Sequence, residues 1–75
     1  MKIEYDDKKD LLYLRFDESP QDVVNKRVND NIVLDIGNDD KIVGIEILDA
    51  MELINLSSVL PVTYDFINRK PVLAS

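Results

Sequence analysis

The chain has 75 residues, a net charge of −6, and neither cysteine nor histidine. Its length allows one domain at most, and the missing residue types exclude disulfides, thiolate metal sites and a histidine general base. A domain this small buries only about 60–65% of its unfolded surface, so we expect oligomerisation to stabilise it. Without a membrane-length apolar run, a signal peptide or cysteine, the chain is expected in the cytoplasm.

The excess of carboxylates narrows the choice of partners. It repels nucleic-acid phosphates and anionic membranes, so we expect the chain to bind neither by itself. It suits a basic protein partner, a cation, or only a soluble surface, and the last of these is the simplest explanation.

The first sixteen residues predict a β-hairpin. Two strands, 2–5 and 11–16, flank the polar loop DDKKD. If residues 7–10 form the turn, the apolar residues of both strands share one face, because side chains alternate along a strand. The expected cross-strand pairs are Tyr5 with Leu12 and Ile3 with Leu14.

Three more strand-like runs follow. Residues 23–31 mix valines with charged residues and a turn signal, which predicts a short edge strand. The β-branched runs 32–36 and 41–48 flank the turn formers GNDD and predict a second hairpin. A two- or four-residue loop would set Ile32 opposite Ile45.

The second face of this hairpin is mixed. It carries two carboxylates, one glycine and three apolar residues, namely Asp35, Glu46, Gly44, Val33, Ile42 and Leu48. A glycine within a strand costs stability and marks a bulge or the close approach of another group. One short helix cannot cover both faces of the sheet, so we expect the apolar members to form a homodimer interface.

The C-terminal third predicts one short helix and an arm. Asp49 and Glu52 have the spacing of a capping box, and Pro61 ends any helix, which leaves about two turns. The stretch VTYDFI alternates in polarity and includes Tyr64 and Phe66. It predicts an extra strand or an extended arm that docks on another surface.

Two stretches resemble one known family. YDDKKDLLYLRF is similar to the opening hairpin of a family of small prokaryotic proteins known only as domain of unknown function 2283. NIVLDIGNDDKIVGIEIL resembles its second signature, and the DA at 49–50 resembles the start of its terminal helix. The resemblance covers residues 1–50, about two-thirds of the chain. Pro61 and the residues after it depart from the helix that family members commonly have.

The resemblance implies an antiparallel sheet that ends in a helix, and a dimer. It implies no established activity. Members that neighbour small toxin-like proteins imply an antitoxin-like role, which is an association and not a mechanism.

Asp35 and Glu46 are the best candidates for chemistry. In the expected register they stand about 13 Å apart, beyond the about 9.5 Å that paired catalytic carboxylates allow. We therefore expect Glu46 to be structural, either bonded near Ala50 or paired with Arg15 or Arg27.

Other motifs for catalysis are missing from the sequence. No serine lies in a hydrolase motif, no glycine pattern fits a phosphate loop, and the acidic turn at 35–40 does not have the spacing of an EF-hand. We therefore expect no enzymatic activity, no cofactor and no metal.

The combined prediction is one α+β domain over residues 1–75, with a family-like core at 1–56 and a divergent extension at 57–75. The core is an antiparallel meander of about four strands with one short C-terminal helix. Two functions fit these features. The first is a non-enzymatic protein-interaction module, antitoxin-like toward a basic partner, and the alternative is a protein that binds a small ligand or a cation.

Overall fold

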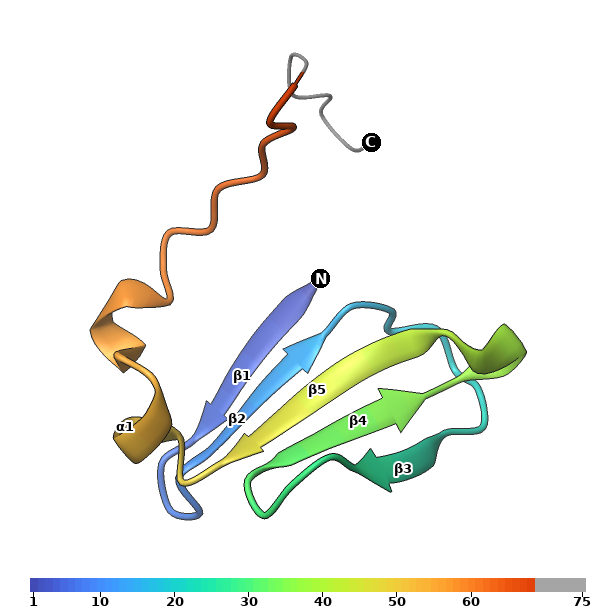
Figure 1. Cartoon of the computed structure of the whole chain (residues 1–75), viewed down its shortest axis with the longest axis horizontal. Helices are drawn as coiled ribbons and strands as arrows, with labels where there is room; N and C mark the ends of the chain where they lie inside the picture. Colours follow the sequence, from blue (N-terminus) through green and yellow to red (C-terminus); the bar gives the residue numbers. More distant parts are fainter. Residues whose placement is uncertain (69–75) are drawn as a thin grey trace.

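The computed structural model describes residues 1–68, and its five strands build one antiparallel sheet (Figure 1). The strands are β1 (Lys2–Asp6), β2 (Leu11–Arg15), β3 (Val24–Arg27), β4 (Ile32–Ile36) and β5 (Ile42–Leu48). Within the described chain they lie in the order β1-β2-β5-β4-β3, so β5 returns to the centre between β2 and β4. The predicted α+β class with an antiparallel sheet is confirmed.

The first hairpin has the predicted register. Ile3 lies opposite Leu14 and Tyr5 opposite Leu12, around a turn at residues 7–10. These four side chains share one face because side chains alternate along each strand. β3 is an exposed edge strand, as its charged residues predicted.

The second hairpin corrects the predicted register. Its loop has five residues, 37–41, and contains a 3-10 turn, η1 (Asn38–Asp40). A bulge beside Asp35 adds a further shift, so Ile32 lies opposite Ile47 and not opposite Ile45. A longer loop and a bulge are both local backbone features that strand periodicity does not report.

The corrected register leaves most side chains on their predicted faces. The shift in β5 totals two residues, and a strand repeats its side-chain direction every two residues. Ile42 is the exception, because it lies beyond the bulge and pairs with Ile36. Ile42 therefore does not share the face of Asp35 and Glu46, where the sequence predicted it.

The helix is shorter than predicted, and a different aspartate caps it. α1 (Ala50–Leu53) has one turn, and a 3-10 turn, η2 (Leu56–Ser58), follows it. Asp49 has φ 54° and makes no side-chain cap, so the predicted capping box is wrong: a capping residue needs an extended backbone. The Asp10 carboxylate accepts a hydrogen bond from the Met51 N–H at 3.0 Å instead.

The sheet has two unlike faces. The apolar face is formed by alternate residues of four strands: Ile3, Leu12, Leu14, Ile32, Leu34, Ile45 and Ile47. Val24 and Lys26 of β3 extend it to the edge of the sheet, where Lys26 lies opposite Leu34. The polar face carries Glu4, Tyr13, Arg15, Asn25, Asp35, Gly44 and Glu46.

Only part of the apolar face is covered. Leu56 and Val59 lie over its β1–β2 half, where they line a groove of about 410 Å³ together with Ile3 and Leu12. At the centre and over β4, residues such as Ile45 stay half-buried. Among residues 1–68, the buried apolar side chains are limited to Leu12, Val33, Val43 and Ala50.

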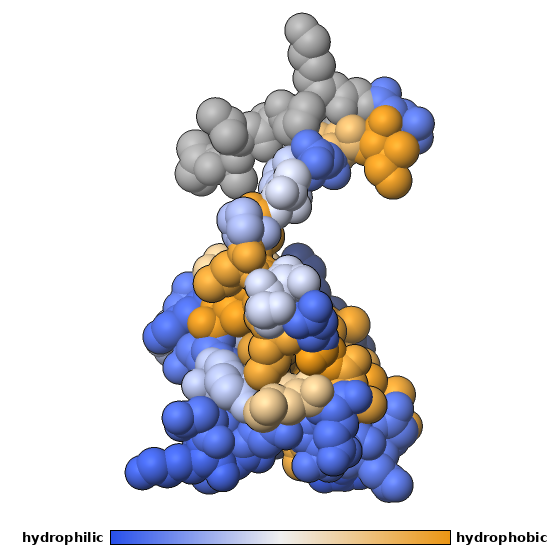
Figure 2. Space-filling view, turned by 90° about the vertical axis from the view of Figure 1, so that its left-hand side faces the viewer, coloured by the Kyte–Doolittle hydropathy of each residue, from blue (hydrophilic) through white to orange (hydrophobic). Residues whose placement is uncertain are grey.

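After η2 the chain leaves the sheet as an extended arm, residues 60–68 (Figure 1). The sequence predicted either an extra strand or an extended arm for residues 62–67. These residues form no strand, so the second alternative describes them. Apolar atoms gather beneath the arm and along one flank of the body, while polar atoms cover the lower end (Figure 2). Residues 69–75 of the predicted extension lie outside the described residues. None of the described helices has the length and apolar character that crossing a membrane requires.

Candidate functional site

The polar face brings four side chains from four strands together. Tyr13 of β2 lies opposite Glu46 of β5, and Asn25 of β3 lies opposite Asp35 of β4. Asp35 itself lies opposite Gly44, two residues from Glu46. The two carboxylates are thus diagonal neighbours, whose Cα atoms stand about 7–8 Å apart. The predicted separation of about 13 Å is corrected with the register.

One amide joins the two carboxylates. The Asn25 side chain donates to Asp35 Oδ1 at 2.6 Å and to Glu46 Oε2 at 3.3 Å. This pair of hydrogen bonds ties the edge strand β3 to β5 across β4. Asn25 therefore stabilises both the carboxylate pair and the position of the edge strand.

The two carboxylates change the acidity of the cluster. Burial and the hydrogen-bonded Asp35 carboxyl group raise the pKa of Glu46, and the Tyr13 hydroxyl opposes this rise. Burial, followed by the adjacent Glu46 carboxylate, raises the pKa of Tyr13. The neighbouring Asp35 carboxylate thus makes ionisation of Glu46 less favourable, because two adjacent like charges repel each other.

Gly44 makes room for Asp35. A Cβ atom at Gly44 would lie 3.3 Å from Asp35 Oδ2 and 3.1 Å from the carbonyl oxygen of Leu14. The missing side chain lets Asp35 lie across β5 toward Glu46. This is the close approach that a glycine within a strand commonly marks.

The cations near the cluster are engaged elsewhere. Arg15 Nε bonds Glu4 Oε1 at 2.6 Å, and its guanidinium stands 4.9 Å from the centre of the Tyr13 ring. Arg27 donates to two backbone carbonyl groups of its own turn. The predicted partners of Glu46 are therefore corrected: in the described part of the chain Asn25 donates a hydrogen bond to it, and Asp35 and Tyr13 are the neighbours that change its pKa.

The other residues singled out by the sequence are dispersed. Val33 is 8% exposed, between Arg27 and Glu46 across the sheet, and Leu48 lies opposite Leu11 at the far end of the polar face. Ile42 is 48% exposed beyond the bulge. Val33, Ile42 and Leu48 do not form one open patch, which corrects the predicted location of a homodimer interface.

Tyr64 and Phe66 lie on the arm, apart from the carboxylate cluster. Their rings meet edge to face, with centroids 5.4 Å apart. Such pairs bury apolar area and add about 0.5–1.5 kcal/mol when they are well packed. They belong to the C-terminal surface and not to the site on the polar face.

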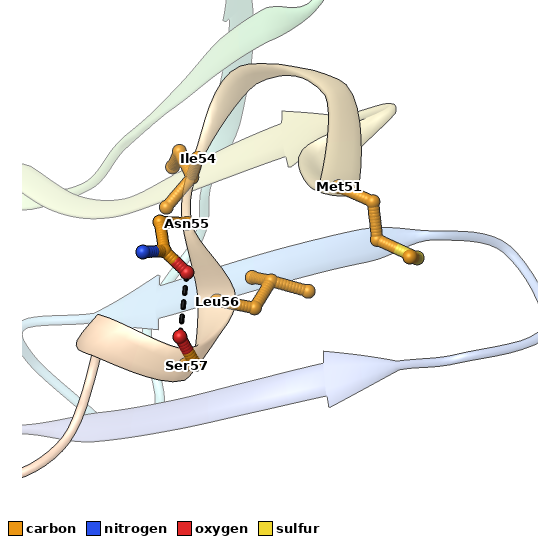
Figure 3. A pocket seen from close by; sticks show the side chains of 5 residues that line it. All are labelled: Met51, Ile54, Asn55, Leu56 and Ser57. Atoms are coloured by element: carbon orange, nitrogen blue, oxygen red, sulfur yellow. Dashed lines mark hydrogen bonds between the residues drawn. The ribbon is translucent and has the colours of Figure 1, made fainter.

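A second hollow lies along α1 and η2. It has a volume of about 290 Å³ and is lined by Met51, Ile54, Asn55, Leu56 and Ser57. Figure 3 shows Leu56 extending toward the side on which Met51 lies, while Ser57 Oγ donates to Asn55 Oδ1 at 2.6 Å. Ser57 is thus bound to an amide rather than to a general base, and the hollow offers apolar contact.

Tyr13 and Asn25 are the functional residues that the sequence did not reveal. Strand periodicity places Tyr13 on the face opposite Leu12, but the pairing of β2 with β5 sets it beside Glu46. Asn25 sits in a stretch with weak strand character, so only the β3–β4 register identifies its role. Over residues 1–68, no three metal-binding side chains are grouped to hold an ion.

Comparison with known proteins identifies the family of the chain. No curated protein and no solved structure matches it. A family model described as "Protein of unknown function (DUF2283)" matches residues 2–50. This match spans all five strands and every residue of the carboxylate cluster. The chain therefore belongs to the DUF2283 family of proteins of unknown function.

Proposed function

We propose that the chain is a non-enzymatic protein-interaction module that works as a homodimer. The apolar face of the sheet joins the two copies, and the acidic polar face is left for a basic partner. The observation that carries this proposal is the uncovered half of the apolar face, where Ile32, Leu34, Ile45 and Ile47 are only half-buried. Sheets in stable domains cover their apolar face with a second layer.

The oligomeric state tests this first part. Sedimentation equilibrium at micromolar concentration should give twice the chain mass of 8.6 kDa. Val24→Lys adds a charge to an exposed edge of the apolar face and should shift the mass toward the monomer. Val23→Lys, at the neighbouring exposed position whose side chain alternates away from that face, is the matched control and should stay dimeric. A folded wild-type monomer would contradict the proposal.

The acidic surface supports a basic partner. The net charge is −6, and Asp35 and Glu46 stand together at the middle of the polar face. A chain of this net charge attracts a basic protein and repels nucleic acid, although Arg15 and Arg27 share the polar face with the two carboxylates. An antitoxin-like role, in which the module neutralises a basic toxin, is the specific form of this proposal.

Capture from the native host tests the second part. The wild-type chain should retain a basic protein that high salt releases, because salt screens charge attraction. The Asp35→Asn/Glu46→Gln variant removes two carboxylates without changing side-chain size and should retain much less of it. Equal capture by both chains, or capture of no basic protein, would contradict the role of the polar face.

Binding of a small cation is the second candidate function. The diagonal carboxylate pair favours it, because a cation between the two groups would offset the repulsion of their like charges. Adding Mg²⁺ or Ca²⁺ should then raise the melting temperature of the wild-type chain, and Asp35→Asn should abolish the rise. An unchanged melting temperature would exclude cation binding at this pair and leave the interaction module as the proposed function.

A further inference from the structure

We infer that the arm, residues 60–68, docks on the apolar face of a second copy, so that the two chains of a dimer exchange their C-terminal arms. This inference rests on the proposed homodimer and specifies how it is built. It assigns one occupant to the uncovered β4–β5 half of each sheet.

The arm has the surface of a docking segment. Leu60 is 67% exposed, Val62 57%, Tyr64 63% and Ile67 96%. Exposing four large apolar side chains within nine residues to water is unfavourable in free energy unless another surface covers them. Leu60, Val62 and Tyr64 alternate along the extended backbone and so share one side, which suits contact with the flat face of a sheet.

The arm does not cover its own sheet. Leu60 and Val62 line a groove with Met1 and Ile3, at the start of the edge strand β1. Beyond that point the arm runs away from β5 and β4 (Figure 1). The radius of gyration is 13.9 Å, against about 11 Å for a compact chain of 75 residues. The arm and the uncovered half of the sheet are therefore separate surfaces of one chain.

The dimensions allow exchange. Nine extended residues span about 30 Å, at about 3.3 Å for each residue. Five strands spaced about 4.8 Å apart make a sheet about 20–24 Å wide. An arm that leaves one copy at β1 can thus cross the whole apolar face of the other.

Polarity gives the arm two unlike sides. Asp65 is the carboxylate of the described arm, and its neighbours Tyr64 and Phe66 are aromatic. Side chains alternate along an extended backbone, so Asp65 points away from a surface that the two rings contact. The rings can therefore lie on the apolar face while the carboxylate stays in water. A twofold dimer makes each such contact twice, because the same surfaces are used on both copies.

Mixed isotope labelling tests the inference on the full chain. A dimer is prepared from equal amounts of ¹³C-labelled and unlabelled protein, and isotope-filtered spectra then report contacts between copies. Arm exchange predicts filtered contacts from the Tyr64 and Phe66 rings to the methyl groups of Leu34 and Ile45. A dimer whose filtered contacts join sheet to sheet, or whose arm contacts only its own sheet, would overturn arm exchange and leave the homodimer. A folded monomer would overturn both.

A charge added to each side of the arm gives an independent readout. Tyr64→Lys puts the charge on the docked side and should raise the dimer dissociation constant about tenfold, because it removes a buried ring. Thr63→Lys adds the same charge at the next position, whose side chain points the other way, and serves as the control. Equal weakening by both variants, or none by Tyr64→Lys, would refute the proposed contact.

Discussion

Asp35 and Glu46 lie diagonally across β4 and β5, and the side-chain amide of Asn25 donates to both, at 2.6 Å and 3.3 Å. This contact explains why the isoleucine-rich strand β5 contains a carboxylate. Glu46 is held by polar neighbours on three other strands, and not by a cation. This relationship makes the stability of the sheet depend on pH.

Glu46→Gln should stabilise the chain at neutral pH. The pKa of Glu46 is raised in the folded state, so its contribution to stability is present at low pH and is lost as pH rises through the folded pKa. Glutamine carries no charge, so the variant keeps the free energy of unfolding that the wild-type chain loses when Glu46 ionises. For neighbouring like charges on a sheet this amounts to about 0.2–1 kcal/mol. Urea unfolding should show the gain at pH 7 and little of it near pH 4. Glu52→Gln, on the exposed α1, is the control, and a less stable Glu46→Gln variant at pH 7 would contradict the assignment.

Asn25→Asp should loosen the edge strand. It replaces the shared donor with a third carboxylate, which repels Asp35 and Glu46 instead of joining them. Compared with the wild-type chain, amide hydrogen exchange of β3 should become faster at pH 7. The difference should be smaller near pH 4, because the raised pKa of Glu46 keeps that carboxyl group mostly uncharged there. Asn25→Ser tests the loss of the donor without added charge and should have a smaller effect. Unchanged β3 exchange in the aspartate variant would show that the amide bridge is unimportant.

Gly44→Ala should destabilise the sheet even though alanine restricts the unfolded chain. The new Cβ would lie 3.1 Å from the Leu14 carbonyl oxygen, which belongs to the paired strand β2 and cannot move freely. Overpacking of this kind costs about 1–3 kcal/mol. Chemical denaturation measures the loss. Adding Asp35→Ala should recover part of the lost stability, because it removes the Asp35 carboxylate, the second group close to the new Cβ. If the effects of the two substitutions on the free energy of unfolding simply add, this packing is wrong.

Asp10→Gly should release both α1 and Tyr5. Glycine keeps the positive φ of 50° at this position while removing the carboxylate. A hydrogen bond from the Tyr5 hydroxyl to Asp10, followed by burial and nearby carboxylates, raises the pKa of Tyr5 to about 12. Ultraviolet titration should therefore show a tyrosine pKa that falls toward its ordinary value in the variant. Asp7→Asn should lower it less, and an unchanged titration in Asp10→Gly would rule out this bond.

The sequence predicted the strands because their residues are β-branched and alternate in polarity. The tight first hairpin was predicted down to its register, since a four-residue turn leaves little choice. The second hairpin was not, because its five-residue loop and the bulge at Asp35 each shift the pairing. The capping box failed for a similar reason: Asp49 has a left-handed backbone, which the spacing to Glu52 does not reveal.

The site was only half visible in the sequence. Asp35, Gly44 and Glu46 stood out because they interrupt apolar strands. Tyr13 and Asn25 complete the cluster through the β2–β5 and β3–β4 pairings, which join residues far apart in the chain. Such long-range register follows from the packing of the whole sheet and not from local pattern.

The central claim is that a second copy covers the apolar face in solution, and a soluble gadolinium chelate tests it most directly. The chelate relaxes the protons that it can approach, so it measures exposure of each side chain in the intact protein. The account predicts that the methyl groups of Leu34 and Ile45 are protected, while the methyl groups of Val23, which is exposed and alternates away from that face, relax quickly. Relaxation of Leu34 and Ile45 as fast as that of Val23 would show a bare sheet face and contradict the account.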